Sequence, residues 1–167
     1  RDKTKSIKEK VKEAREIREL CKRNGVIFIV NDHVDIAILV DADGVHIGQD
    51  DMDPSDVRKL IGDNKIIGLS THSEEQGMKA YLNPDVDYIG VGPIFPTTTK
   101  DTAPVGLGYL EYAVKNLHLP FTAIGGIKGH NLHEIISRGA KNVCLVSDIV
   151  GADNITEKVK ELQKLMK

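Results

Sequence analysis

The segment VDYIGVGPIFPTTTK, residues 86–100, contains the pattern that decides how this chain should fold. An apolar strand with glycine at its end, Val86 to Val91, runs directly into a loop that carries three threonines and Lys100. Small residues let an anion approach the backbone closely, and hydroxyl groups and a cation then donate charge-assisted hydrogen bonds to it. We therefore expect a phosphorylated ligand at the end of this strand.

A second strand end repeats the pattern. The segment FTAIGGI, residues 121–127, ends its apolar run in Gly125 and Gly126. These glycines could simply form a tight turn between a strand and a helix, but two adjacent glycines also expose backbone N–H groups that can bind phosphate. Two such ends in succession predict one anionic site at the mouth of a parallel sheet.

Strands and helices are predicted to alternate along the whole chain. Short apolar runs, such as VIFIV at residues 26–30, fit strands buried on both faces of a parallel sheet. The repeat of roughly 20–25 residues is the length of one short βα unit. Strands are expected near residues 26–30, 43–47, 65–69, 86–91, 120–124 and 142–146. Helices are expected near residues 6–23, 33–40, 54–62, 73–82, 107–116, 130–138 and 154–166.

Candidate functional groups follow every predicted strand, and this spread favours a barrel over an open sheet. An open sheet concentrates its site at one switch point, whereas a barrel draws on most of its strand ends. We therefore predict an α/β fold, a (βα)8 TIM barrel forming one domain over residues 1–167. Because six strands are visible, the first two are expected to precede Arg1, with self-association or a complementing N-terminal fragment completing the barrel. The groups are Asn31-Asp32, His46 to Asp51, Ser70 to His72, Gly92 to Lys100, Gly125-Gly126 and Ser147.

The composition excludes several classes of function. A net charge of −2 and the absence of tryptophan argue against a nucleic-acid binder. No apolar run approaches the roughly 20 residues that span a bilayer, so a cytoplasmic protein without membrane contact is expected. Cys21 and Cys144 each lie in an apolar pattern, which predicts buried thiols in a reducing compartment.

Carboxylates follow two neighbouring strands. Asp32 follows the first, and Asp50 and Asp51 follow the second. Carboxylates at adjacent strand ends could share Mg²⁺, which prefers such oxygens together with substrate phosphate. Helix N-capping by Asp32 and Asp53 is the alternative, and Asp50 could be a solvated charge.

The segment STHSE, residues 70–74, closes one strand and opens a helix. Ser73 is expected to cap the helix, whereas Ser70 lies at the strand tip with its hydroxyl available to a ligand. His72 could be an acid or base, a phosphate donor or a structural histidine, and the structural role is favoured.

Taken together, these residues resemble thiamine-phosphate synthase, a TIM-barrel family that shares its fold with thiazole tautomerase. The resemblance runs from Arg1 to about Ile149 and depends on the order and spacing of its motifs. Those motifs are RDK (1–3), VND (30–32), GVHIGQDD (44–51), GLSTH (68–72), DYIGVGPIFPTTTK (87–100), AIGGI (123–127) and VS (146–147).

The resemblance implies a transferase of thiamine biosynthesis. It would join 4-amino-2-methyl-5-(diphosphooxymethyl)pyrimidine to 4-methyl-5-(2-phosphooxyethyl)thiazole with Mg²⁺, by a dissociative path, giving thiamine phosphate and diphosphate. By matching position, Asp32 and Asp51 would bind Mg²⁺, while Asp50 stands where the family commonly has glutamate and is given no role. The pyrimidine diphosphate would be held by Arg1, Lys3, Asn31, Ser70 and Lys100, of which Arg1, Lys3, Ser70 and Lys100 are also the catalytic candidates. The thiazole phosphate would be held by Thr97, Thr99, Gly126, Val146 and Ser147.

Two alternatives stay open at this point. A thiazole tautomerase would need neither the carboxylate pair nor Lys100, and His72 is its best argument. An inactive phosphate-binding fragment is the other alternative, because two strands are expected to be missing.

Overall fold

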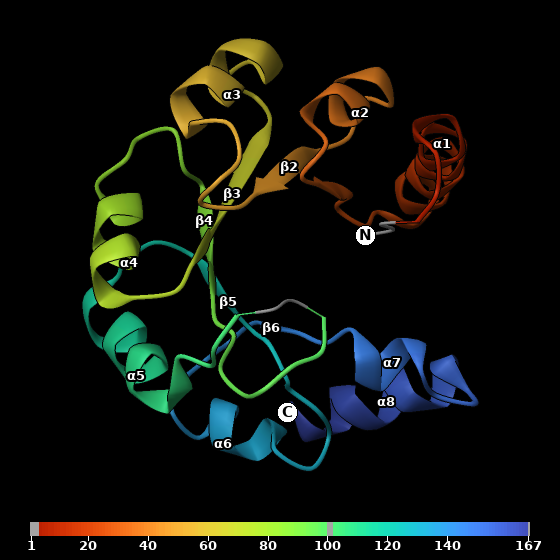
Figure 1. Cartoon of the computed structure of the whole chain (residues 1–167). Coiled ribbons are helices and arrows are strands. Elements are labelled where there is room, and N and C mark those ends of the chain that lie inside the picture. The colour runs from red at the N-terminus through yellow and green to blue at the C-terminus, as the bar shows by residue number, and fades with distance from the viewer. Residues whose placement is uncertain (1–3, 100–101, 167) are drawn as a thin grey trace. The chain divides into compact units, whose positions relative to one another are not determined.

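The computed structural model describes residues 4–99 and 102–166. Six parallel strands alternate with helices in an α/β fold, which can be followed by colour and label in Figure 1. The strands are β1 (Ile29–Asn31), β2 (Gly44–Ile47), β3 (Ile66–Thr71), β4 (Tyr88–Val91), β5 (Phe121–Ile124) and β6 (Val143–Cys144). The helices are α1 (Ile7–Asn24), α2 (Val34–Leu39), α3 (Pro54–Ile61), α4 (Glu74–Tyr81), α5 (Gly106–Asn116), α6 (Leu132–Ile136), α7 (Ser147–Val150) and α8 (Ile155–Leu165).

The chain forms two compact units, and the boundary between them falls within β3 and β4. The first unit contains the chain up to Ser70 together with residues 84–88, and the second contains residues 71–83 and the chain from Ile89 onward. In the first unit β1, β2 and β3 pair in parallel in chain order, and in the second β4, β5 and β6 do the same. The six-stranded α/β prediction is therefore confirmed, whereas the two strands expected before Arg1 remain a prediction.

Apolar side chains of the strands and of α2 and α3 form the core of the first unit. Val45, Ile47 and Ile67 are fully buried, and Val57 of α3 belongs to the same core. Alternate strand residues face opposite sides of a sheet. His46, between Val45 and Ile47, therefore lies on the other face from these two residues.

Local signals in the sequence set the helix ends. Ser6 caps α1 in a reciprocal capping box with Glu9, and Gly25, with a φ of 64°, ends the helix in the left-handed conformation. Ser73 caps α4, and Asp53 caps α3 by accepting the N–H of Ser55.

Strands β1, β4 and β6 are each shorter than predicted by two residues or more. Strand β1 begins at Ile29 rather than Val26, and the side chains of Val26 and Ile27 are 55% and 65% exposed. The apolar run predicts one buried strand, but its first residues belong to the connection after α1. Strand β6 ends at Cys144, and the four-residue helix α7 that follows has no signal in the sequence.

The two cysteines are free thiols, as expected, but each is only partly buried. Cys21 lies on α1. Among the described residues of this helix only Ala14 is buried, because most of the helix faces solvent. Cys144 ends the short strand β6, and burial raises the pKa of its thiol.

The amino ends of the strands in the first unit are fastened by charged side chains that bond to the chain itself. The guanidinium group of Arg58 donates to the carbonyl oxygens of Gly62 at 3.0 Å, Lys65 at 2.6 Å and Asp85 at 3.0 Å. It also pairs with the carboxylate of Asp87 at 2.8 Å. A planar cation with five donors can hold several acceptors at once, so Arg58 ties the entries of β3 and β4 together.

The helices in the described part of the chain are not suited to a bilayer, because none is both long and apolar enough to cross one.

Candidate functional site

Three candidate residues lie at the carboxyl ends of β1 and β3 in the first unit, and His46 of β2 joins two of them. The N–H group of Asp32 donates to the backbone oxygen of His46 at 2.9 Å. The imidazole Nε2 of the same histidine lies 2.9 Å from the hydroxyl of Ser70. Asn31 is the last residue of β1 and precedes Asp32, so three predicted site residues meet at one edge of this unit.

The side-chain amide of Asn31 is the clearest sign of a ligand. Its Nδ2 atom is buried and has no hydrogen-bond partner among the described residues. A buried donor without an acceptor costs about 1–3 kcal/mol, so such a group usually serves a purpose. It borders a cavity of about 170 Å³ that Asp32, Lys10 and His33 also line, with Lys10 Nζ 3.3 Å from His33 Nε2. A bound acceptor oxygen would satisfy this amide.

The carboxylate of Asp32 does not cap a helix. The N-cap of α2 is His33, so the capping alternative for Asp32 is wrong. Asp32 has a φ of 64°, a conformation that aspartate and asparagine tolerate better than most residues, and its side chain is exposed. Within the described residues this carboxylate has no side-chain hydrogen bond or ion pair, which leaves its oxygens available.

Asp51 lies in the loop that follows β2. Its Oδ2 atom accepts the N–H of Gly48 at 2.6 Å, which orders the loop. In the same loop Gln49 donates to the backbone oxygen of Ser70 at 2.7 Å. The described residues contain no cluster of three or more histidine, cysteine or acidic side chains that could hold a metal alone. A Mg²⁺ site with only two carboxylates is therefore one in which substrate oxygens and water complete the coordination.

His72 belongs to the second unit, where two hydrogen bonds to neighbouring residues hold it in place. Its Nδ1 atom donates to the backbone oxygen of Gly92 at 2.5 Å, and its N–H donates to the side chain of Gln76 at 2.8 Å. The neighbouring Thr71 hydroxyl contacts the oxygen of Gly90 at 2.9 Å and the hydroxyl of Tyr109 at 2.6 Å. Burial raises the pKa of Tyr109, so this phenol stays neutral and can keep its hydrogen bond.

The loop after β4 lies along the end of β5 in the second unit. The N–H groups of Ile94 and Phe95 donate to the oxygens of Ile124 and Gly125 at 2.9 and 3.0 Å. Gly126 then meets this loop so closely that a Cβ atom added to it would lie 2.5 Å from the oxygen of Pro96. The two predicted glycine-bearing strand ends are therefore in direct contact, as the sequence indicated.

The remaining candidates of the second unit lie in the loops after β4 and β6. Thr99 donates its N–H to the hydroxyl of Thr97 at 3.1 Å, which turns the loop locally. Val146 is 43% exposed and precedes Ser147, the first residue of α7. These two residues follow β6, the strand that pairs with β5, and so lie at the same edge of the sheet as the turn at Gly126.

Sequence reasoning missed the residues that hold the candidates in place. Tyr88 bonds to His46, and the buried Asn131 donates its amide to the oxygen of Gly126 at 3.1 Å. The contact between Tyr88 and His46 joins residues that are distant in the sequence, so no local motif could predict it. Arg1, Lys3 and Lys100 lie outside the described residues.

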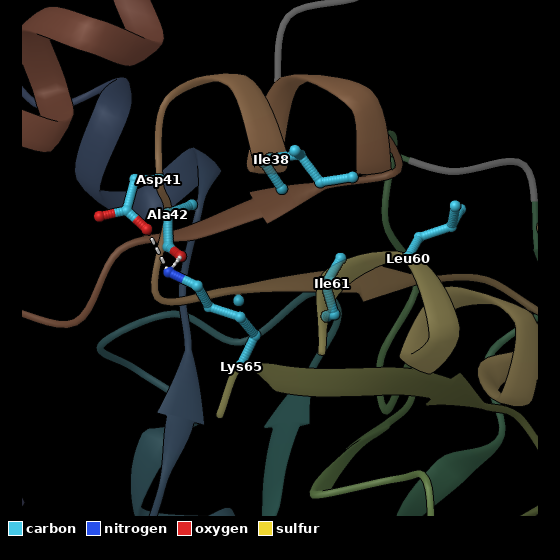
Figure 2. A pocket seen from close by; sticks show the side chains of 8 residues that line it. Ile38, Asp41, Ala42, Leu60, Ile61 and Lys65 are labelled. Atoms are coloured by element: carbon cyan, nitrogen blue, oxygen red, sulfur yellow. Dashed lines mark hydrogen bonds and ion pairs between the residues drawn. The ribbon is translucent and has the colours of Figure 1, made fainter. Parts of the chain in front are cut away.

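A separate pocket of about 180 Å³ opens at the other ends of β2 and β3. Figure 2 shows Lys65 turned toward Asp41 and the oxygen of Ala42, with Ile38 and Leu60 nearby on the helices. Lys65 is the only cation among the described residues that line this pocket, and it is already paired with Asp41. This pocket lies beside Gly44, the first residue of β2, and so at the amino edge, away from the candidate residues.

The model of one protein family, thiamine monophosphate synthase, matches residues 1–149. The chain belongs to the thiamine monophosphate synthase family. It is 56% identical to the thiamine-phosphate synthase of Pelotomaculum thermopropionicum over 99% of this chain and 77% of that protein. It is 49% identical to that of Caldicellulosiruptor bescii over 100% of this chain and 77% of the relative.

A solved structure shows the fold of this synthase family. The thiamine phosphate pyrophosphorylase of Pyrococcus furiosus superimposes with a TM-score of 0.91 at 33% identity, over 99% of this chain and 79% of that one. The family resemblance seen in the motifs is therefore confirmed along nearly the whole chain.

Replacing Gly126 with alanine tests the contact between the two loops in this family member. Gly126→Ala should raise the KM for the thiazole phosphate by about tenfold or more, because small displacements of positioning groups are costly. The added Cβ would meet the Phe95 and Pro96 backbone, and the φ of 65° is unfavourable for alanine. Steady-state kinetics with each substrate varied in turn would measure the effect.

Gly108→Ala is the matched control for that substitution. Nothing lies within 4 Å of a Cβ atom at Gly108, which is inside α5. Both KM values should stay unchanged, and the free energy of unfolding should rise by about 0.5–1 kcal/mol. An unchanged thiazole phosphate KM in Gly126→Ala would contradict a role for this turn in binding.

Proposed function

We propose that this chain catalyses the synthesis of thiamine phosphate from 4-amino-2-methyl-5-(diphosphooxymethyl)pyrimidine and 4-methyl-5-(2-phosphooxyethyl)thiazole. Membership of the synthase family supports this activity. The single observation that carries it is the buried, unpartnered amide of Asn31 beside the exposed carboxylate of Asp32 among the described residues. A donor and a carboxylate side by side suit a diphosphate that arrives with a divalent cation.

The first unit would hold the pyrimidine diphosphate. Asn31 and Ser70 would donate hydrogen bonds to it from the ends of β1 and β3. The resemblance to the family adds Arg1, Lys3 and Lys100 to these donors by their positions in the sequence alone. Asp32 and Asp51 would hold Mg²⁺. The carboxylate of Asp32 is exposed and has no side-chain partner among the described residues, and Asp51 uses only its Oδ2 atom in the hydrogen bond to Gly48. When bound, the cation would neutralise negative charge on the diphosphate.

The second unit would hold the thiazole phosphate. Gly126 carries a positive φ and packs on Phe95 and Pro96 of the loop after β4. Thr97 and Thr99 follow in the same loop, where the hydroxyl of Thr97 accepts the N–H of Thr99. Small residues and hydroxyls of this kind suit a phosphate group. Val146 and Ser147 would complete this part of the site.

The chemistry needs no nucleophile from the protein. The bond between the pyrimidine methylene carbon and the diphosphate oxygen breaks, and both electrons leave with the diphosphate. The amino-pyrimidine stabilises the resulting cation, and the thiazole nitrogen then donates its electron pair to form the new carbon–nitrogen bond. Donors such as Ser70 and Lys100 would stabilise the charge that builds on the leaving group, and the remaining contribution of the protein is positioning.

A proton shift on a thiazole, as in the tautomerase alternative, would give the carboxylate of Asp32 no task. His72 would be the base of that reaction, and the hydrogen bond from its Nδ1 atom to the oxygen of Gly92 leaves only Nε2 for that task. The synthase is therefore the proposal, with small-molecule substrates and a cytoplasmic setting as part of it.

The deciding experiment is an assay of thiamine phosphate formation from the two phosphorylated precursors. This chain would be tested with Mg²⁺ and again with a chelator, and diphosphate release would be measured in parallel. Equal amounts of the two products, formed only with Mg²⁺, are expected. Diphosphate release without thiamine phosphate would contradict the proposed activity. No reaction at all would contradict it too and would leave the binding-fragment alternative.

A further inference from the structure

Three residues of the first unit, Tyr88, His46 and Ser70, form a hydrogen-bonded chain that ends at Ser70. The hydroxyl of Tyr88 lies 2.9 Å from Nδ1 of His46, and Nε2 of His46 lies 2.9 Å from the hydroxyl of Ser70. Both ring nitrogens of the histidine are therefore occupied by hydroxyl groups. Ser70 is only 9% exposed, so its hydroxyl has few alternative partners.

A glycine makes room for this arrangement. A Cβ atom at Gly68 would lie 2.2 Å from Cζ of Tyr88 and 2.4 Å from Nδ1 of His46. The two rings, with centroids 5.4 Å apart and planes at 41°, fill the space that a side chain at this position would take. Gly68 thus lets the rings lie across β3 at hydrogen-bonding distance.

The chemistry of the three groups sets the direction of the hydrogen bonds. A neutral imidazole has one N–H donor and one acceptor nitrogen, so one hydroxyl must donate to it and the other must accept. A phenol, with an ordinary pKa of about 10, is a stronger acid than the hydroxyl of serine and so the better donor. Tyr88 is therefore the expected donor to Nδ1, which leaves Nε2–H as the expected donor to Ser70.

We propose that Tyr88 and His46 are positioning residues that keep the Ser70 hydroxyl as a hydrogen-bond donor toward the pyrimidine diphosphate. With its oxygen held by Nε2–H, Ser70 has its own proton left for an acceptor on the substrate. The bond from Gln49 to the backbone oxygen of Ser70 fixes the other side of the same residue. This inference rests on the proposed function for the identity of the acceptor, but not for the tautomer of His46.

The tautomer can be measured on the unaltered chain. In ¹⁵N-labelled protein, two-bond proton–nitrogen correlations of His46 should show the Nε2–H form with Nδ1 as acceptor. Assignment would come from the loss of those signals in His46→Gln. The Nδ1–H form would overturn the proposal, whatever the activity of the protein.

A double-mutant cycle tests the connection to catalysis. Tyr88→Phe should lower kcat/KM for the pyrimidine diphosphate by about tenfold, the value of one modest hydrogen bond, and leave the KM for the thiazole phosphate unchanged. In a Ser70→Ala background the same substitution should have no further effect, because the hydroxyl that it orients is gone. An equal loss in both backgrounds would indicate a merely structural Tyr88 and overturn the proposal.

Rescue by a conservative variant supplies a second readout. His46→Gln keeps a side-chain N–H at the same number of bonds from the backbone as Nε2 and should retain most of the turnover. His46→Leu should lose as much as Ser70→Ala, at an unchanged melting temperature. Equal losses in the two His46 variants would contradict the proposal. Inactivity of the unaltered chain would contradict the proposed function instead, and the tautomer measurement would still decide the inference.

Discussion

Asp32→Asn should reduce Mg²⁺-dependent turnover by about 10²–10³-fold, the usual cost of losing a group that stabilises developing charge. Asparagine adopts the positive φ of Asp32 readily, and the replaced carboxylate has no side-chain hydrogen bond within the described residues. The fold should therefore be unaffected, and the loss should come from the weaker hold on the cation. The dependence of rate on Mg²⁺ concentration, together with thermal melting, measures both effects.

Asp51→Asn should reduce Mg²⁺-dependent turnover by a similar factor. Asp50→Asn is the matched control. In Asp51→Asn the amide oxygen of the new side chain can still accept the N–H of Gly48, so the loop should stay ordered. Asp50 is exposed, neighbours Asp51 and carries the same charge, but it has no proposed role. Equal losses in the Asp50 and Asp51 variants would point to a general charge effect and contradict the Mg²⁺ assignment.

Lys100→Ala should also cripple turnover while leaving the fold intact. The resemblance of residues 87–100 to the family motif implies that this lysine binds the diphosphate, where a cation would stabilise the leaving group as its charge develops. Its loss should lower kcat by about 10²-fold or more, because that charge is greatest in the transition state. Single-turnover measurements at saturating substrate would separate this effect from weaker binding.

Lys115→Ala is the control for Lys100→Ala. Lys115 is exposed in the last turn of α5. Lys115→Ala removes the same charge as Lys100→Ala, but it should leave the turnover rate within a small factor of the original. Near-normal rates in Lys100→Ala would contradict the proposed diphosphate site. They would not bear on the proposed thiazole phosphate site.

The sequence predicted the parts of the fold that depend on local patterns. Helix ends at Ser6, Gly25 and Ser73 follow from capping chemistry, which acts over a few residues. The predicted start of β1 was wrong. An apolar run shows that its residues prefer burial, but it does not show which of them pair with a neighbouring strand. Val26 and Ile27 have the composition of a strand and lie exposed.

The candidate site was predictable where motif and strand end coincide. Asn31, Asp32 and Ser70 were found because each lies at the end of a recognisable apolar strand. The hydrogen bonds from Tyr88 to His46, and from His46 to Ser70, join residues 42 and 24 positions apart in the chain. Contacts at such separations are set by strand pairing and by the space above Gly68, which no short motif records.

The amino and carboxyl edges of the first unit differ in whether their polar groups have hydrogen-bond partners within the protein. This difference affects how the protein can evolve. At the amino edge, Arg58 and Lys65 use their donors on the chain itself. At the carboxyl edge, Asn31 keeps a buried donor that no described residue satisfies. Substitutions at the two edges should therefore add independently, since they share no partners among these contacts. New substrate preferences can then arise at one edge while the other preserves the fold, so that selection can act on specificity and on stability through separate sets of residues.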